Sequence, residues 1–228
     1  MKRFERRVVP VLVLLALCDP DQAPGDSTSS QWNKAIVDTA AGSGYLTNDE
    51  KQVVLEINMV RTDPAEYARR FLAPLRSYYR RALLQYPGEI VILTHEGVRA
   101  LDECIQGLLA TKPLLPMSPK EGLALAARDH AEDQAATGAI GHTGSDGSSP
   151  AERIGRYGKW GIAAGENIDY GNGDPRRIVI SLLIDDGVPS RGHRSNLLNR
   201  GFRFVGVSMG AHGVYRHMCV MDFAGSFR

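Results

Sequence analysis

The sequence has few cysteines, no excess of charge and no long apolar run. It contains three cysteines and no Cys-x-x-Cys pair, which argues against a cysteine-rich zinc site. With 27 basic and 26 acidic side chains, its formal charge of +1 gives no electrostatic case for nucleic-acid binding. No apolar run approaches the about 20 residues that a membrane-spanning helix needs, and no internal repeat is present. What remains, with 43% hydrophobic residues among 228, is the composition of an ordinary globular domain.

The N-terminus has the pattern of an export signal. Basic residues at positions 2–7 precede an apolar run over residues 8–17. Cys18 follows directly, as in a lipoprotein processing site, although Leu17 stands where a small residue is expected. We therefore expect residues 1–18 to be a signal peptide or a lipoprotein signal, and the mature protein to be secreted, periplasmic or held at the cell envelope. A membrane contact is expected only through a lipid anchor or an uncleaved signal.

The remaining chain divides into a linker and one domain. Residues 19–45 lack apolar periodicity and read as a flexible linker, and residues 46–228 form the predicted domain. Cys104 and Cys219 remain as an even pair in an oxidising compartment, which makes a Cys104–Cys219 disulfide one hypothesis and two buried free thiols the other.

Helix signals dominate the first part of the domain and strand signals its end. Caps or prolines open expected helices at Thr47, Asp63, Ser118, Ser149 and Asp174. Two β-rich runs, over residues 202–209 and 214–223, flank a turn expected at residues 210–213. The pattern predicts an α+β fold, with helices packed around a sheet.

Three polar segments place an ionisable side chain between glycines or beside a helix end. They are residues 141–147, 164–168 and 185–196. Glycine lets the backbone approach a ligand closely, which suits the rim of a cleft. Each segment alone also has an ordinary interpretation, a solvated loop or a helix terminus.

Taken together, the order and spacing of the three segments resemble the CAP superfamily, also called the SCP domain, in its bacterial exported branch. The resemblance covers residues 50–225 in outline and is specific from about residue 118 onward. The residues that carry it are His142-Thr143-Gly144, Gly165-Glu166-Asn167-Ile168 and Gly192-His193-Arg194-Ser195-Asn196-Leu197-Leu198-Asn199, followed by the strand Val205-Gly206-Val207.

The resemblance implies a three-layer α-β-α sandwich with a central antiparallel sheet and an open cleft lined by histidines and acids. It assigns His142 and His193 as the two histidines and Glu166 as the first acid. Asp186 stands nearest to the position of the second acid, with Asp185 one residue away. A glutamate is usual there, and residues 187–191 lengthen the loop that follows.

Imidazoles and carboxylates that converge in a cleft can bind a metal, transfer protons or hold a hydrogen-bond network. The resemblance favours a non-enzymatic binding module for a small apolar or amphipathic ligand, a lipid above all. His142 and His193 are the candidate ligands for zinc or another divalent cation. The alternative is a metal-dependent hydrolase of cell-envelope material, with Glu166 as the candidate catalytic base.

Other histidines and serines are assigned structural roles. His130 and His217 are expected to be buried within the fold. Neither Ser145 nor Ser195 lies in the strand-turn-helix setting of a hydrolase nucleophile, which argues against a serine hydrolase.

Overall fold

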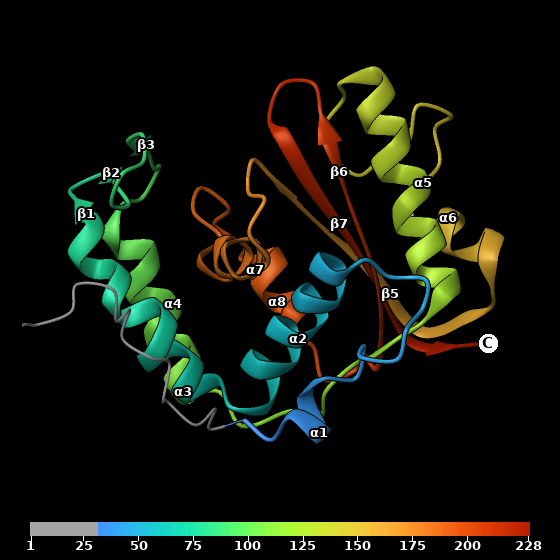
Figure 1. Cartoon of the computed structure of the whole chain (residues 1–228), viewed down its shortest axis with the longest axis horizontal. Coiled ribbons are helices and arrows are strands. Elements are labelled where there is room, and N and C mark those ends of the chain that lie inside the picture. Colours follow the sequence, from blue (N-terminus) through green and yellow to red (C-terminus); the bar gives the residue numbers. More distant parts are fainter. Residues whose placement is uncertain (1–31) are drawn as a thin grey trace, which may run out of the picture. The chain divides into compact units, whose positions relative to one another are not determined.

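The computed structural model describes residues 32–228, and the predicted export signal lies outside the described residues. Helices come first along this region, and two long paired strands come at its end (Figure 1). The helices are α1 (Lys34–Val37), α2 (Asn48–Thr62), α3 (Pro64–Tyr67), a π-helical turn η1 (Ala68–Leu72), a 3-10 helix η2 (Ala73–Tyr78), α4 (Val98–Ala110), α5 (Glu121–Thr137), α6 (Pro150–Tyr157), α7 (Pro175–Ile184) and α8 (Gly192–Leu197).

The main sheet has four strands in the order β4-β6-β7-β5. Its strands are β4 (Ser118–Pro119), β5 (Trp160–Tyr170), β6 (Phe204–His212) and β7 (Arg216–Phe227). β5, β7 and β6 pair antiparallel, as expected, and the short β4 joins β6 in parallel. β5 is therefore an edge strand, with one side free of strand pairing, and the candidate site lies along it.

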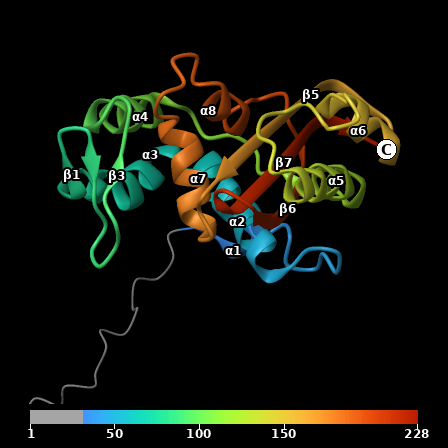
Figure 2. The ribbon, with the colours of Figure 1, turned by 90° about the horizontal axis from the view of Figure 1, so that it is seen from above.

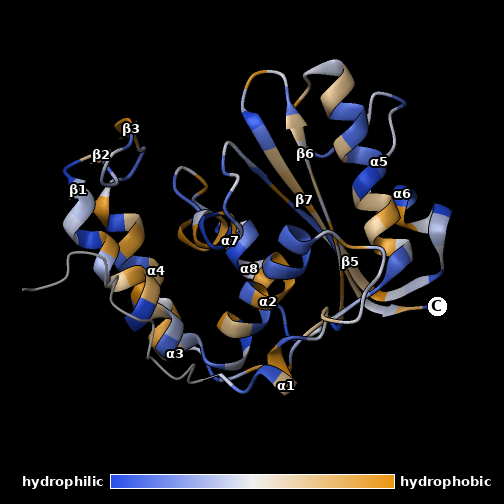
Figure 3. Cartoon of the chain, in the orientation of Figure 1, coloured by the Kyte–Doolittle hydropathy of each residue, from blue (hydrophilic) through white to orange (hydrophobic). Residues whose placement is uncertain are grey.

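Helices cover both faces of this sheet, so the domain is the expected α-β-α sandwich (Figures 1 and 2). On one face, Ala127 of α5 packs with Ile168 and Val220. The other face carries Cys219, Met221 and Phe223, which join the larger core with α2, α4 and α7. Figure 3 shows that α2, α4 and α7 each carry hydrophobic as well as hydrophilic residues. None of the helices in residues 32–228 is long and apolar enough to cross a bilayer.

A glycine sets the distance between α5 and the sheet. A Cβ atom built on Gly206 would lie 2.0 Å from the carbonyl carbon of Leu123. Since real Cβ atoms do not approach so closely, the α5 backbone can rest on β6 only where a side chain is missing. Sheet and helix are in backbone contact at this point.

Between η2 and α4 a short three-stranded sheet stands apart from the main sheet. Its strands are β1 (Tyr79–Arg80), β2 (Leu83–Leu84) and β3 (Ile92–Leu93), paired antiparallel in that order. We call residues 79–94 the arm. Several of its apolar side chains are exposed, with Ile90 at 86% and Leu93 at 76%.

Several helix starts follow their predicted caps, and others differ. Thr47 and Ser149 each form a reciprocal capping box, and Asp63 and Asp174 cap their helices as predicted. Ser118, in contrast, lies in β4, and the helix there begins at Glu121 without a side-chain cap. The residue pairs with β6 because the chain is still extended at that point.

The domain includes residues that the sequence pattern assigns to the linker. Part of the predicted linker, residues 32–45, packs on the domain. Trp32 is buried, and its indole N–H donates to the carbonyl oxygen of Met59 at 2.9 Å. Val37 and Ala40 are buried as well. The sequence does not predict this packing, because single apolar residues, rather than a repeating apolar stripe, anchor the segment.

The disulfide hypothesis is wrong in this structure. Cys104 on α4 and Cys219 on β7 are both free and buried. Burial raises the pKa of the Cys104 thiol to about 12, and it raises that of Cys219 well above its usual value. Both side chains act as small apolar core residues.

Candidate functional site

Two histidines from opposite sides of the β5 edge meet at the candidate site. His142 lies in the loop between α5 and α6, and His193 lies in the first turn of α8. Their ring centroids are 6.4 Å apart, and the rings are inclined by 37°. We refer to them as the histidine pair. Their side chains remain accessible, with 49% of His142 and 25% of His193 exposed.

Glu166, which lies on strand β5, orients the ring of His142. Its Oε1 accepts from the imidazole Nδ1 at 2.7 Å, while its other oxygen accepts from Arg153 Nη2 at 2.7 Å. The Glu166 side chain is only 1% exposed. Because an ionised carboxylate can only accept, the His142 Nδ1 carries the hydrogen, and in the neutral imidazole the lone pair is on Nε2. The structure thus brings together His142 and Glu166, which the family resemblance assigns to one cleft.

Arg153 is the buried cation that sequence reasoning missed. It lies on α6 with 2% exposure, and it donates to the carbonyl oxygens of Ser148 at 2.9 Å and of His142 at 3.0 Å as well as to Glu166. The arginine therefore neutralises the acid and also fixes the loop that carries His142. The capping box at Ser149 predicts the helix, but no sequence pattern indicates this partner.

A second acid lies beside Glu166 within the sheet. Asp222 of β7 is opposite Glu166 in the strand register and is completely buried. No N–H or O–H group in residues 32–228 donates to either of its carboxyl oxygens. Burial, followed by the charge of Glu166, raises the pKa of Asp222 well above its usual value. The surroundings of Asp222 therefore favour its neutral form, and the ion pair beside it is that of Glu166 with Arg153.

Asp185, rather than Asp186, holds His193. The Oδ1 of Asp185 accepts from His193 Nδ1 at 2.7 Å, and its Oδ2 accepts from the His193 backbone N–H at 2.9 Å. Asp186 points elsewhere, since its oxygens accept from the backbone N–H groups of His95 at 2.6 Å and Glu96 at 2.7 Å. The assignment of Asp186 as the second acid is corrected accordingly.

The backbone explains this one-residue difference. Asp185 ends α7 in a left-handed conformation, with φ 57° and ψ 41°. The chain therefore turns one residue before Asp186 and directs the Asp185 carboxylate to the start of α8. Arg194 stabilises this corner, because it donates to the carbonyl oxygens of Leu183 and Ile184, the last of α7.

Asparagines join α8 to β5. Asn167 donates to the carbonyl oxygen of His193 at 3.0 Å. Asn196 donates to Asn167 Oδ1 at 2.9 Å and to the carbonyl oxygen of Glu166 at 3.2 Å. The predicted segments 164–168 and 185–196 are therefore hydrogen-bonded to each other, and these bonds fix the position of α8 on β5.

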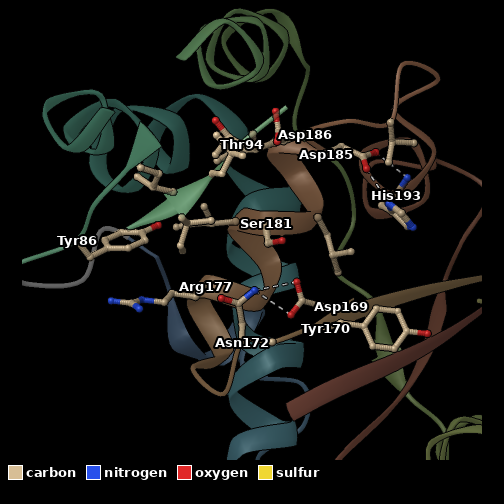
Figure 4. Close-up of a pocket in the computed structure, with 18 of the residues that line it drawn as sticks. Tyr86, Thr94, Asp169, Tyr170, Asn172, Arg177, Ser181, Asp185, Asp186 and His193 are labelled. Carbon is tan, nitrogen blue, oxygen red and sulfur yellow. Dashed lines mark hydrogen bonds and ion pairs between the residues drawn. The ribbon is translucent and has the colours of Figure 1, made fainter. Parts of the chain in front are cut away.

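Hollows lie on both sides of the histidine pair. The smaller, of about 270 Å³, is lined by His142, Glu166 and the start of α6. The larger, of about 490 Å³, lies between the arm, α7 and the end of β5, with His193 on its wall (Figure 4). We call the larger one the arm pocket. The pair thus stands between two spaces that a ligand could occupy.

Histidines outside the pair have different surroundings from one another. His130 is buried as predicted, and its Nε2 lies 2.8 Å from the carbonyl oxygen of Gly141. The prediction for His217 is wrong, since its side chain is exposed and His212 is the buried histidine of the hairpin. β6 extends to His212, so the turn lies later than predicted and His217 falls near the uncovered end of the hairpin.

Serine chemistry finds no support in this geometry. Ser145 donates to Asp133, away from His142. The letters of a Gly-x-Ser-x-Gly elbow do occur at residues 206–210, but they lie entirely within β6, and Ser208 is 3% exposed. The strand-turn-helix that exposes a nucleophile is missing at this motif.

Comparisons with known proteins identify the family. The model of the cysteine-rich secretory protein family, CAP, matches residues 57–223. No curated protein matches the chain. One similar solved structure is an outer surface protein of Borrelia burgdorferi, with 22% identity and a TM-score of 0.42 over 49% of this chain and 78% of that one.

Another is an extracellular protein containing a SCP domain from Bacillus anthracis, with 26% identity and a TM-score of 0.40. That alignment covers 49% of this chain and 34% of the other. The family match spans more than half of the sequence, and this protein therefore belongs to the cysteine-rich secretory protein (CAP) family.

Proposed function

We propose that this CAP-domain protein is an extracytoplasmic binding module whose cleft, at the histidine pair, takes a lipid-like or other small ligand. The observation that carries the proposal is the arrangement of the pair. Each Nδ1 is fixed on a buried carboxylate, which leaves each Nε2 free, and a hollow adjoins each ring. Concave sites with apolar walls and a few oriented polar groups are typical of small-molecule binding.

The pair also fits a divalent cation in its donor chemistry. His142 and His193 would hold the cation through Nε2, while Glu166 and Asp185 act as the outer carboxylates that orient metal-binding histidines. No group of three or more His, Cys, Asp or Glu suited to a metal occurs among residues 32–228. When bound, the cation would supply a Lewis acid whose remaining positions belong to water or ligand.

A binding role is better supported than the hydrolase alternative. Glu166, the candidate base, has both oxygens engaged, one by His142 and one by Arg153. Its side chain is 1% exposed, and action as a general base would require one of these bonds to break. Its position supports an orienting role.

An extracytoplasmic location is proposed from the sequence. The basic start and apolar run of residues 1–17 have the pattern of an export signal, and Cys18 is the residue that would carry a lipid anchor. Release of the protein into the medium or periplasm, against retention with the membrane fraction, would distinguish the two forms of signal.

Native mass spectrometry tests the proposal. The protein is incubated with a total lipid extract, with and without Zn²⁺, and adducts are counted. We expect wild type to carry a lipid or a zinc ion, and the double variant His142→Ala/His193→Ala to lose at least nine-tenths of these adducts, on the order of the tenfold or larger effects seen at metal sites. His217→Ala is the matched control, since that histidine is exposed and lies outside both hollows.

Two outcomes would contradict the proposal. One is a wild-type protein that takes up neither lipid nor zinc under any condition, and the other is equal adduct formation in the double variant. Turnover of envelope material that disappears in Glu166→Gln would instead establish the hydrolase.

A further inference from the structure

The arm pocket has apolar walls over most of its extent. The arm contributes Leu84 and Ile92 to one side, and α7 contributes Ile180 and Leu182 to the other. Its volume of about 490 Å³ lies within the range of pockets that hold small organic ligands. The pocket can therefore bury an apolar group of modest size.

A buried acid lies in this apolar setting. Asp169 follows the site segment on β5, and the residue is 4% exposed. Its two oxygens accept from Asn172 Nδ2 at 2.9 and 3.0 Å, and Ser181 of α7 lies beside it (Figure 4). No arginine, lysine or histidine of residues 32–228 forms an ion pair with it. Burial raises the pKa of Asp169 to about 6, as expected of a carboxyl group without a cationic partner.

The basic side chains around the pocket are engaged elsewhere. Arg177 donates to Glu89 through two bonds, of 2.6 and 2.5 Å, and lies over the ring of Tyr86. His193 pairs with Asp185, and Asp186 accepts from backbone amides only. The charges that remain uncompensated on the wall of the pocket are therefore negative.

We propose that the arm pocket binds a small amphiphilic amine, with its ammonium group on Asp169 and its apolar part between the arm and α7. A carboxylate amphiphile, such as a fatty acid, would place its charge against Asp169, and the repulsion between the two carboxylates would weaken its binding. The inference rests on the proposed function, because His193 belongs both to the histidine pair and to the wall of this pocket.

The effect of the charge can be tested separately from that of the apolar chain with three probes that share an eight-carbon chain. They are n-octylamine, n-octanol and n-octanoate, titrated calorimetrically into the purified protein at pH 7.5. We expect octylamine to bind at least tenfold more tightly than octanoate. Lowering the pH from 7.5 to 5 should weaken octylamine binding several-fold, because Asp169 then becomes protonated.

Asp169→Asn is the decisive variant, since the amide keeps the shape of the acid and removes its charge. It should weaken octylamine binding at least tenfold and change octanol binding by less than threefold, which also shows that the pocket is intact. Asp49→Asn makes the same change of charge at an exposed position of α2 and should leave all three affinities unchanged.

The inference is overturned if octanoate binds as tightly as octylamine, if Asp169→Asn keeps the octylamine affinity, or if neither octylamine nor octanol binds. His142→Ala separates this result from the proposed function, because His142 does not line the arm pocket. If the variant loses zinc and keeps octylamine, both proposals stand. If octylamine fails to bind wild type while zinc or lipid adducts persist, only the amine inference falls.

Discussion

Replacement of Arg153 by methionine should destabilise the protein severely. Methionine fills a similar volume but leaves the buried Glu166 carboxylate without its cation and two backbone carbonyls without their donor. Removing one partner of a buried ion pair costs about 3–5 kcal/mol. Since a whole domain is stable by only about 5–15 kcal/mol, the loss is a large share of the total.

The charge term can be isolated with Glu166→Gln. If the cost in each single variant comes mainly from an unbalanced buried charge, then Arg153→Met/Glu166→Gln removes both charges and must cost less than the sum. We expect a coupling energy of about 2–3 kcal/mol, the upper part of the range for contacting residues. Urea unfolding of the four proteins, followed by circular dichroism at pH 7, measures it.

Hydrogen exchange provides a local readout of the same change. Arg153 bonds the carbonyl oxygen of His142, so the amides of residues 141–147 should exchange faster in Arg153→Met, beyond the change caused by lower global stability. A loss in unfolding free energy below about 1 kcal/mol, the average for any mutation, would refute this account of the buried charges. So would additivity of the two variants within about 0.5 kcal/mol.

Three further predictions concern other buried groups. Burial raises the pKa of Asp169 to about 6 in the folded protein, so the acid lowers the free energy of unfolding as pH rises through that value. Relative to wild type, the free energy of unfolding of Asp169→Asn should therefore gain up to about 3 kcal/mol between pH 3.5 and 7, as measured by urea unfolding. Gly206→Ala should lower the free energy of unfolding by about 3 kcal/mol, the upper part of the usual range for overpacking, and lower the melting temperature, since its Cβ meets the α5 backbone. An unchanged melting temperature would contradict the contact. Cys104 and Cys219 should resist iodoacetamide in the native protein and react fully in guanidinium without reductant, which peptide mapping would detect.

Local signals in the sequence predict the parts of the fold that depend on neighbouring residues. The helices after Thr47 and Ser149 begin where a capping box can form, because the cap satisfies amide donors within the same turn. The two β-rich runs over residues 202–209 and 214–223 correctly predict the strands β6 and β7. The joint placement of His142, Glu166 and His193 came from resemblance to a family rather than from periodicity.

The sequence could not predict features set by pairing over long distances. Arg153 and Asp222 are charged residue types in a buried layer, and hydropathy assigns such residues to the surface unless their partners are known. The choice between Asp185 and Asp186 depends on a left-handed residue at the end of α7, which a pattern of residue types does not fix. Trp32 is anchored by a bond to Met59, on a helix that begins well after it.

The position of β5 at the edge of the sheet explains how the histidine pair can form. Consecutive strand residues point to opposite faces, so Glu166 reaches His142 on the α5–α6 side while Asn167 holds α8 on the other. An irregularity earlier in β5 determines which of its residues face each side of the sheet. From Gly161 to Ala164 the strand advances by three residues, whereas the paired part of β7 advances by two. The extra residue reverses the alternation for all that follows. A neighbouring strand on the free edge would separate the imidazoles, so β5 must remain unpaired for its two faces to share one site.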